Sequence, residues 1–395
     1  MIGLRMQNWK IVFVVNSYID RPGNIGLRVG KVIDKLEELG IPSLVISRGG
    51  RVGSEFVRVE NLPAWFGLVA RMFNAVRIYA NKNFRSRLFD IKIFEWLVNR
   101  KMEAISRFVR EGKGVVHLVE SSPELVRVFQ RAGYVVILDV PIAPASFVVN
   151  QFFLNKKIDG FSDVSYLVPL ERKAFELADR IVVPSIFVKN CIEADGMASS
   201  KIMVIPFGTD VGDRRFSRSV RKDSALKACF AGVVGKRKGV DVLLDAWAKV
   251  CDQSDTLFLC GRLTPHIKAA ISNLGKKVSV LAPGFVQVEE FFQTSDLYVF
   301  PSYLEGSSKS IYEAMAHGLA VITTFESGSV VEDGVSGLIV AAGSVDELAA
   351  AIARLKADRE LLLSLQKGAF DAVKKFTWSK YAHELIEQYK EIGNA

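Results

Sequence analysis

The segment that decides the fold is Asp296-Leu297-Tyr298-Val299-Phe300, followed by Pro301-Ser302-Tyr303-Leu304-Glu305-Gly306-Ser307-Ser308-Lys309-Ser310 and then by Ile311–Ala316. The first run predicts a buried parallel strand, and the apolar-periodic stretch Ile311–Ala316 predicts a helix that Gly318 ends. Unpaired backbone N–H groups at the start of a helix attract anions. This junction therefore predicts a sugar-nucleotide site, with a diphosphate over Gly306, Ser307, Ser308, Lys309 and Ser310 and hydroxyl groups on Glu305 and Glu313.

The same residues have a simpler interpretation. Ser310, followed three residues later by Glu313, fits a capping box, and Glu305 is also consistent with a solvated loop acid. The neighbouring sequence favours the ligand site, because a second turn suited to anions occurs in the same half of the chain.

That second turn follows the apolar run Ala228–Phe230 and reads Gly232-Val233-Val234-Gly235-Lys236-Arg237-Lys238-Gly239. A guanidinium binds phosphate oxygens in pairs and an ammonium acts as a point charge, so Arg237 and Lys238 are suited to stabilise a leaving diphosphate. The Walker pattern is not met, because no Ser or Thr follows the Gly-Lys pair as that motif requires. The alternative is a solvated cationic turn.

Strands and helices alternate along the whole chain, which predicts two doubly wound parallel sheets. Neither half carries Gly-x-Gly-x-x-Gly followed by an acid, which argues against a nicotinamide enzyme. In the first half the expected strands are 11–15, 43–46, 115–119, 135–139, 180–185 and 201–206, with helices over 27–39 and 171–178. In the second half they are 228–230, 256–259, 278–281, 296–300 and 320–323, with a helix over 240–250.

Composition places the chain among globular proteins. It has 395 residues, of which 49% are hydrophobic and 24% charged, enough for two ordinary domains. No apolar run is long enough to span a bilayer and the first ten residues lack a signal-peptide core, so we expect a cytoplasmic location. The cysteines form no Cys-x-x-Cys pair and sit in apolar runs, which predicts buried thiols; they are Cys191, Cys229, Cys251 and Cys260.

The pattern Glu305-Gly306, then Glu313-Ala314-Met315-Ala316-x-Gly318, resembles the acidic motif of GT-B glycosyltransferases of the retaining family 4. The resemblance implies two Rossmann-like domains facing a crevice, over 1–207 and 208–375, with a C-terminal helix over 376–395 packing back on the first domain. It places Glu305 near the donor sugar, Glu313 on the nucleotide ribose, and Arg237 and Lys238 at the diphosphate.

Further positions follow from the same resemblance. Gly232 belongs to the diphosphate turn, Arg262 and Val286 follow strands whose turns pack on the nucleotide base, and Gly23 lies in a loop that approaches the donor. The donor is a nucleotide-diphosphate sugar, and neither a cofactor nor a metal is expected. No Asp-x-Asp occurs in the chain, which agrees with a diphosphate held by fixed cations and a helix dipole.

The chain departs from the family pattern at several positions. Val233 stands where the first basic residue of the clamp often falls, and Gly23 and Gly26 are not adjacent. The region 138–144 has no histidine, although many relatives place one there near the sugar. We interpret His117 as a core residue, and Asp139 and Glu120, each at a strand end, as solvated loop acids.

Residues 61–110 carry ten basic and three acidic side chains, a local charge of +7. Their helical pattern mixes cations with Trp65, Phe66 and Phe73, which is consistent with docking on an anionic membrane surface. The alternative is an ordinary helix with its aromatic face in the core. Nucleic acid is not expected, because no recognised motif accompanies the charge.

The sequence therefore predicts a retaining glycosyltransferase that moves a sugar from a nucleotide-diphosphate donor to a hydroxyl of a glycan or lipid-linked acceptor, in synthesis of cell-envelope polysaccharide or glycolipid. A peripheral position on the inner face of the cell membrane fits such an acceptor. Two alternatives stay open: a glucosyltransferase with a soluble acceptor, and a catalytically silent subunit that binds sugar nucleotides.

Overall fold

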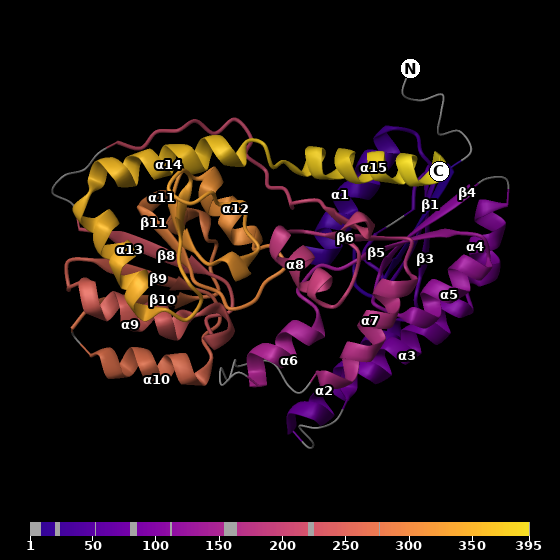
Figure 1. Cartoon of the computed structure of the whole chain (residues 1–395), viewed down its shortest axis with the longest axis horizontal. Helices are drawn as coiled ribbons and strands as arrows, with labels where there is room; N and C mark the ends of the chain where they lie inside the picture. Colours follow the sequence, from indigo (N-terminus) through magenta and orange to yellow (C-terminus); the bar gives the residue numbers. More distant parts are fainter. Residues whose placement is uncertain are drawn as a thin grey trace. The chain divides into compact units, whose positions relative to one another are not determined.

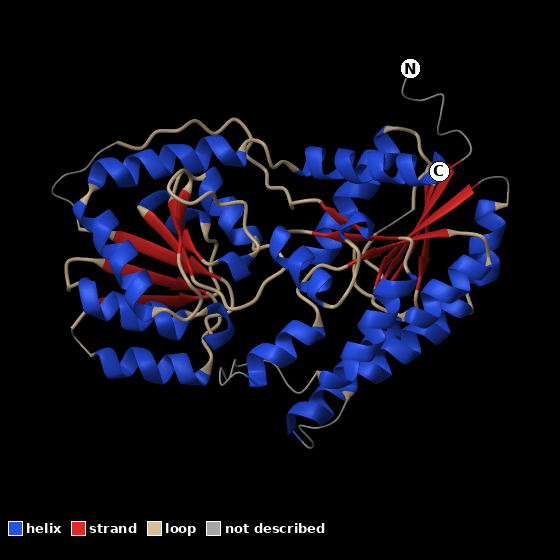
Figure 2. Cartoon of the chain, in the orientation of Figure 1, coloured by secondary structure: helices blue, strands red, loops and turns tan. Residues whose placement is uncertain are grey.

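The computed structural model describes residues 9–19, 24–51, 53–79, 85–110, 113–153, 164–219, 225–275 and 277–394. These residues form two compact units, coloured along the chain in Figure 1. Unit 1 contains the described residues up to Ile205 together with the C-terminal helix from Trp378, and unit 2 contains Pro206–Thr377. Both are α/β, as Figure 2 shows, and both match the fold class expected from the sequence.

Unit 1 is built on a seven-stranded sheet in the order β3-β2-β1-β4-β5-β6-β7, with every neighbouring pair parallel. The strands are β1 (Trp9–Val15), β2 (Ser43–Ser47), β3 (Val57–Asn61), β4 (Lys113–Val119), β5 (Val135–Asp139), β6 (Arg180–Val183) and β7 (Ile202–Val204). The helices are α1 (Asn24–Glu38), α2 (Ala64–Tyr79), α3 (Ser86–Asn99), α4 (Met102–Val109), α5 (Pro123–Arg131), α6 (Ala145–Phe153), α7 (Val168–Leu177), α8 (Ile186–Ala194) and α15 (Trp378–Asn394).

Unit 2 repeats the plan with a six-stranded parallel sheet in the order β10-β9-β8-β11-β12-β13. The strands are β8 (Lys227–Ala231), β9 (Thr256–Cys260), β10 (Ser279–Gly284), β11 (Leu297–Phe300), β12 (Ala320–Thr323) and β13 (Gly337–Ile339). The helices are α9 (Val240–Val250), α10 (Pro265–Leu274), α11 (Glu289–Thr294), α12 (Lys309–Ala316), α13 (Val345–Ala357) and α14 (Arg359–Val373), and two short 3₁₀ turns are η4 (Lys236–Lys238) and η5 (Phe325–Ser327).

The central strands are buried on both faces because helices cover both sides of each sheet (Figure 1). In unit 2 all four residues of β11 are fully buried, and in unit 1 the same holds for Ile11–Val15. Their uninterrupted apolar sequence is the reason that these strands were predictable. The edge strand β3, half exposed and alternating Val57-Arg58-Val59-Glu60, was not predicted.

The C-terminal helix α15 packs on α1 and β4 within unit 1. Its apolar face buries Trp378, Leu385 and Ile386, while the hydroxyl of Tyr389 contacts the ring of His117 in β4. The tail is therefore an integral part of the core of unit 1.

The basic region folds largely as α2 and α3, and one interpretation of it was wrong. Phe66 does not face outward: it is fully buried, and its ring stacks on that of Phe94. Its neighbour Trp65 stays 46% exposed. The side chain of Arg77 and the whole of Lys82 lie outside the described residues. Among the described helices, none is long and apolar enough to cross a bilayer.

Candidate functional site

The predicted site residues of unit 2 gather at one edge of its sheet. Because every strand is parallel, their carboxyl ends meet at that edge, where ligands bind in such folds. Each strand there is followed directly by a segment that the sequence singled out: Gly232 after β8, Gly261-Arg262 after β9, Phe285-Val286 after β10, and Pro301–Ser308 after β11.

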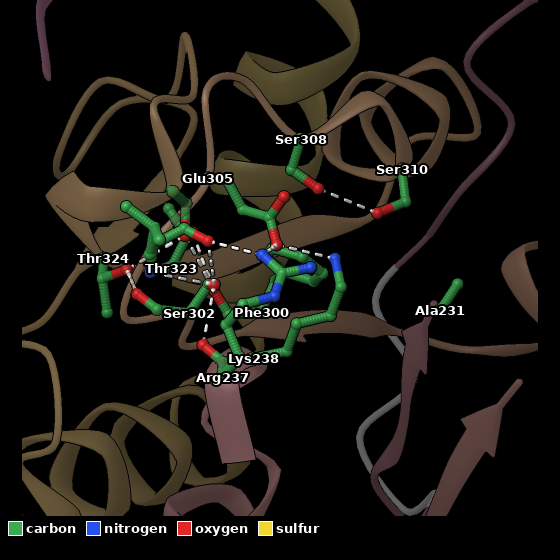
Figure 3. A network of polar contacts seen from close by, with 12 residues as sticks. Ala231, Arg237, Lys238, Phe300, Ser302, Glu305, Ser308, Ser310, Thr323 and Thr324 are labelled. Atoms are coloured by element: carbon green, nitrogen blue, oxygen red, sulfur yellow. Dashed lines mark hydrogen bonds and ion pairs between the residues drawn. The ribbon is translucent and has the colours of Figure 1, made fainter. Parts of the chain in front are cut away.

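Glu305 joins the two cations of the second turn. Its Oε1 accepts hydrogen bonds from Arg237 Nη1 at 2.5 Å and from Lys238 Nζ at 2.8 Å, and the residue is 8% exposed (Figure 3). The three residues predicted to act at the donor sugar and diphosphate thus form one ion-pair cluster. Glu305 is not the solvated loop acid of the simpler interpretation, since two cations hold its carboxylate in place.

The backbone brings these turns together. Gly239, which follows η4, has φ +67°, and a Cβ there would lie 2.0 Å from the carbonyl oxygen of Pro301. Only glycine fits this left-handed position against another backbone. The contact is closed by hydrogen bonds from Tyr303 N (3.0 Å) and Ser302 Oγ (3.2 Å) to the carbonyl of Arg237. The cationic turn is therefore fixed to the loop that carries Glu305.

A group of buried hydroxyls at the end of β12 and in η5 supports this loop. Thr323 Oγ1 donates to Phe300 O at 2.9 Å, and Thr324 Oγ1 donates to Ser302 O at 2.5 Å. Ser327 Oγ lies 3.0 Å from Thr324 Oγ1 (Figure 3 shows part of this network). Because buried carbonyls need donors, these hydroxyls keep the Glu305 loop in one conformation.

Lys238 has a partly apolar environment. Its Nζ lies 4.5 Å from the centre of the Phe300 ring. The end of the Lys238 side chain packs against Gly232, where a Cβ would lie 3.4 Å from Lys238 Cε. Burial lowers the pKa of Lys238, and Arg237 lowers it further, while Glu305 acts in the opposite direction. The ammonium is therefore a cation that an incoming anion would stabilise.

Helix α12 begins at Lys309 with Ser308 as its N-cap. Ser310 is consequently inside the first turn, so the alternative of a Ser310–Glu313 capping box is wrong. Instead, Ser310 Oγ lies within hydrogen-bond distance of Tyr298 Oη, at 2.7 Å, and 3.1 Å from Ser308 Oγ. Tyr298 Oη also lies 3.3 Å from Ala231 O, which ties the start of α12 to the end of β8.

Two further predicted residues are engaged with their neighbours. Ser307 is 2% exposed and its Oγ lies 2.9 Å from the hydroxyl of Tyr312. Glu313, half buried, forms an ion pair of 2.7 Å with Lys309 Nζ. Among the five residues expected to hold a diphosphate, Ser307 therefore has its hydroxyl engaged by Tyr312, and Lys309 brings a cation to the start of α12.

The ends of β9 and β10 form the other side of this edge. Arg262 is exposed and Val286 half buried, both in the places that the sequence predicted. Sequence reasoning gave no role to Phe285, which is 96% exposed. An aromatic ring left in water beside a ligand edge is suited to stack on a base. Gly23, the predicted donor contact in the first half, lies outside the described residues.

Unit 1 has its own polar cluster at the carboxyl ends of its strands. Glu120, after β4, is 6% exposed and accepts hydrogen bonds from Arg87 Nη2 (2.7 Å) and Asn16 Nδ2 (2.7 Å). Arg87 also forms an ion pair of 2.5 Å with Asp90. Asp90 is paired in addition with Arg48, which follows β2. The interpretation of Glu120 as a solvated loop acid was therefore wrong, because an arginine of α3 neutralises it.

The interpretation of Asp139 as a solvated loop acid was also wrong, because a buried arginine pairs with it. Its side chain is fully buried, and Oδ2 lies 2.6 Å from Arg28 Nη1 and 2.9 Å from His117 Nε2. Burial by itself would raise the pKa of Asp139, but Arg28 and His117 together outweigh burial and hold the pKa below its ordinary value. His117 is a core residue, as expected.

The cysteines behave mainly as predicted. Cys229, Cys251 and Cys260 are buried free thiols, and burial raises the pKa of each to about 12. Cys191 is half buried.

Comparison with known proteins agrees with this geometry. The family model described as "Glycosyl transferases group 1" matches residues 225–358, which include every predicted site residue of unit 2. Residues 225–358 are similar to a group 1 glycosyl transferase domain. The match contains the Glu305 loop, η4 and the start of α12, so the ion-pair cluster lies within the matched residues.

Sequence relatives are more distant. The chain is 29% identical over 248 residues to the D-inositol 3-phosphate glycosyltransferase of Geodermatophilus obscurus, covering 55% of this chain and 54% of that protein. It is 28% identical over 254 residues to the enzyme of the same name from Corynebacterium jeikeium, covering 57% and 60%. The chain thus matches little more than half the length of these relatives.

Solved structures match over nearly the whole chain and show that it has the GT-B fold. Sucrose-phosphate synthase from Thermosynechococcus elongatus superposes with a TM-score of 0.66 at 18% identity, covering 98% of this chain and 99% of the other. Anabaena HepE in complex with UDP-glucose gives 0.64 at 17% identity, covering 97% and 99%. WaaG, a glycosyltransferase involved in lipopolysaccharide biosynthesis, gives 0.65 at 16% identity, also covering 97% and 99%.

Proposed function

We propose that the protein is a hexosyltransferase that moves a sugar from a nucleotide-diphosphate donor to a hydroxyl of a glycan or lipid-linked acceptor, with retention at the anomeric carbon. The observation that carries the proposal is the cluster of Glu305, Arg237 and Lys238 within the residues that match the group 1 family. Its position at the carboxyl edge of the sheet, beside the start of α12, is where a diphosphate is best stabilised.

In this proposal the donor lies along that edge. Arg237, Lys238 and the N–H groups at the start of α12 hold the diphosphate, Glu305 lies on the sugar side, and Glu313 exchanges its partner Lys309 for the ribose hydroxyls. Arg262, Phe285 and Val286 contact the base. The complex of HepE with UDP-glucose, a protein of the same fold, supports a donor of this class.

The chemical step asks little of a protein base. In a front-face transfer the bond from the anomeric carbon to the diphosphate oxygen breaks, the acceptor oxygen bonds to the same face, and the leaving diphosphate takes the acceptor proton. Charge builds on the leaving oxygens, and fixed cations lower the energy of that state. Arg237 and Lys238 supply those cations, and no metal or other cofactor is proposed.

The test is a screen of UDP-, GDP- and ADP-sugars for release of the nucleoside diphosphate, with and without membrane extracts as the acceptor source. Lys238→Met should abolish the release, whereas Lys249→Met, an exposed lysine of α9, should leave it unchanged. A wild-type chain that binds nucleoside diphosphates and releases none from any donor would instead be the silent binding subunit.

We further propose that the face formed by α2 and α3 docks on an anionic membrane, which favours a lipid-linked over a soluble acceptor. Trp65, Leu68, Met72 and Val76 follow helical spacing on one side of α2, and Leu68 is 62% and Met72 54% exposed. On α3, Phe89 and Trp96 are exposed as well. An apolar face of this kind, with the exposed Arg71 beside it, suits a bilayer interface.

The residues that would make this membrane contact differ from those expected from the sequence. Arg87, Lys92 and Lys101 are paired with Glu120, Glu95 and Glu60, so apolar side chains carry more of the proposed contact than net charge does. In flotation with vesicles of phosphatidylcholine and phosphatidylglycerol, the wild type should float and the double variant Leu68→Gln/Met72→Gln should not. Leu281→Gln, an exposed leucine of unit 2, is the matched control. Equal flotation of all three would refute the membrane contact.

A further inference from the structure

A cavity of about 590 Å³ lies within unit 2, at the edge of the sheet opposite to the edge that carries Glu305. Its walls include Asp296, which precedes β11, and Gly318, which precedes β12, so it lies at the amino ends of these parallel strands. Strand β11 has four residues and separates the two edges by roughly 13 Å. Small-molecule sites have volumes of about 300–1,000 Å³. The cavity is therefore large enough for a ligand other than the donor.

The described lining of this cavity is rich in positive charge. Three arginines of the segment 214–219 contribute to it, namely Arg214, Arg215 and Arg218. Asp296 is the single acid among the described lining residues; it is 7% exposed, and its Oδ2 accepts the backbone N–H of Lys227 at 3.0 Å. A concave surface with this balance of charge attracts anions.

Arg218 holds the frame of the cavity. Its guanidinium donates hydrogen bonds to backbone carbonyls at the C-terminal ends of α11 and α12, those of Phe292, Ser295 and His317. The dipole at such a helix end repels an anion, and a guanidinium placed there offsets it. Because Arg218 does this for both helices, the charges of Arg214 and Arg215 are not needed at these helix ends.

Arg214 and Arg215 are exposed and have N–H groups that a ligand can use. Nη1 of Arg214 donates to the carbonyls of Asp210 (2.7 Å) and Val211 (3.0 Å), which fixes the position of its guanidinium. Neither arginine forms an ion pair with an acid among the described residues. Two adjacent guanidinium groups supply the paired donors that phosphate oxygens accept best.

His317 adds a group that suits phosphate in either protonation state. Its Nδ1 lies 2.8 Å from the carbonyl oxygen of Glu313, which can only accept, so Nδ1 carries a proton and Nε2 has no partner among the described residues. Burial lowers the pKa of His317, the Glu313 carbonyl opposes this, and Arg214 lowers it further. The neutral ring accepts from a protonated phosphate, and the charged ring donates to a dianion.

Phe216 provides an apolar wall. It is half-buried, and its ring lies 5.9 Å from that of Phe370 between ring centroids. A Cβ at Gly318, where φ is +68°, would lie 3.2 Å from Phe216 Cδ2, so glycine lets the phenyl ring lie close to the end of α12. A cavity that combines cations with an apolar wall fits a phosphate on a small carbon skeleton better than a bare inorganic ion.

We propose that this cavity is a second ligand site, which binds a phosphate monoester with its phosphate on Arg214 and Arg215 and its carbon skeleton against Phe216. The site is separate from the proposed donor site, because Glu305 and Lys238 lie at the opposite edge of the sheet. The inference does not depend on the proposed transferase activity. A soluble sugar phosphate and the headgroup of phosphatidic acid both present this chemistry.

The test is calorimetric titration of the full chain with glucose 6-phosphate, ribose 5-phosphate and glycerol 3-phosphate, and with glucose as the uncharged probe. At least one phosphate should bind, and glucose should not. Arg215→Met should weaken binding by about tenfold or more, since charge-assisted hydrogen bonds are lost. Gln293→Glu, which puts a negative charge in the wall, should also weaken it. The matched controls Arg354→Met and Gln253→Glu, at exposed positions of unit 2, should not.

Lys238→Met separates this site from the proposed donor site. It should weaken nucleoside diphosphate binding and leave the affinity for the phosphate monoester unchanged, whereas Arg215→Met should do the reverse. Failure of the transferase proposal would therefore appear in the nucleotide titrations alone. Loss of monoester binding in Lys238→Met would place that ligand at the donor edge and overturn the inference.

A flotation experiment distinguishes the two sources of the phosphate. It uses vesicles of phosphatidylcholine and phosphatidic acid and the Leu68→Gln/Met72→Gln background, in which the proposed contact of α2 is removed. Flotation that Arg215→Met abolishes and Arg354→Met preserves would assign the site to a lipid headgroup, and soluble ester binding without such flotation would assign it to a free small molecule. No binding in either experiment, or binding that both Arg215→Met and Gln293→Glu leave unchanged, would refute the site.

Discussion

Tyr389 Oη lies 2.9 Å from His117 Nδ1 and joins the C-terminal helix to the central strand β4 of unit 1. The other ring nitrogen of His117 faces the carboxylate of Asp139, which can only accept a hydrogen bond when ionised. His117 Nε2 therefore carries the proton and Nδ1 accepts from the tyrosine hydroxyl. The histidine is a structural link between α15 and the sheet.

Replacing Tyr389 by Phe should lower the free energy of unfolding of unit 1 by about 1–2 kcal/mol, because it leaves His117 Nδ1 buried without a donor. Urea denaturation followed by circular dichroism measures the change. Nucleoside diphosphate binding by unit 2 should be unaffected and serves as the control. An unchanged midpoint would mean that the contact contributes nothing to stability.

Arg218 forms hydrogen bonds with the C-terminal ends of two helices of unit 2. Its guanidinium donates to the carbonyls of Ser295 (2.5 Å), Phe292 (2.7 Å) and His317 (3.1 Å), which follow or end α11 and α12. A cation at the C-terminal end of a helix also stabilises its dipole.

The variant Arg218→Met should therefore destabilise unit 2 by about 2–4 kcal/mol, since charge-assisted hydrogen bonds to several buried carbonyls are lost together. Differential scanning calorimetry of the full chain measures the shift. The matched control is Arg215→Met, an exposed arginine three residues earlier, which should leave the transition in place. Equal shifts of the transition in both variants would show that the contacts of Arg218 with the helix ends do not stabilise unit 2.

Glu305 and Lys238 should respond differently to substitution. Lys238→Met removes a cation and should weaken nucleoside diphosphate binding at least tenfold. Glu305→Gln removes the negative charge between Arg237 and Lys238, so diphosphate binding should stay the same or tighten, whereas sugar transfer should fall at least a hundredfold. Calorimetric titration with UDP, GDP and ADP, beside turnover assays, separates the two effects. Weaker diphosphate binding in Glu305→Gln would contradict the assigned roles.

The sequence could place this edge of unit 2 because its information is local. Each predicted residue follows an apolar strand, and parallel strands bring their carboxyl ends together. The direct contact of Glu305 with Arg237 and Lys238 was not predictable in the same way, since it depends on the close approach of Gly239 to Pro301.

Unit 1 was harder to predict because its polar residues are satisfied by distant partners. Asp139 pairs with Arg28 of α1, and Glu120 pairs with Arg87 of α3. The sequence around either acid indicates burial only weakly, so both looked like ordinary loop residues. A strand-end acid in an otherwise apolar neighbourhood, together with an arginine in an apolar helix face, is the weak signal that was present.

Phe285 offers a test of the proposed base recognition by unit 2. Stacking of a base on an aromatic side chain contributes about 1–3 kcal/mol, so Phe285→Ala should raise the Kd for the preferred nucleoside diphosphate at least fivefold. Inorganic diphosphate, which has no base, should bind both forms equally. Leu281→Ala, an exposed residue of β10, the strand that Phe285 follows, is the control. Equal nucleotide affinity in Phe285→Ala would exclude the contact.

Glu171 should make the stability of unit 1 depend on pH near neutrality. Its pKa in the folded chain is about 7, above the ordinary value of 4.5, so between these values the folded state holds a proton that the unfolded state has released. This contribution is full below about pH 4.5 and is lost as the pH rises through 7. Over that interval it amounts to at most about 3 kcal/mol. The charged groups that face Glu171 are Glu120, Arg87 and Asp195, from the segment after β4, from α3 and from the end of α8.

The measurement is urea unfolding of the wild type and of Glu171→Gln at pH 5, 6, 7 and 8. Since glutamine cannot titrate, the stability of the wild type relative to the variant should fall steadily from pH 5 to pH 7 and level off at pH 8. Glu124→Gln, on the exposed face of α5, should show no such trend. A difference between wild type and Glu171→Gln that stays constant across the four pH values would show that Glu171 titrates at its ordinary pKa in the folded chain.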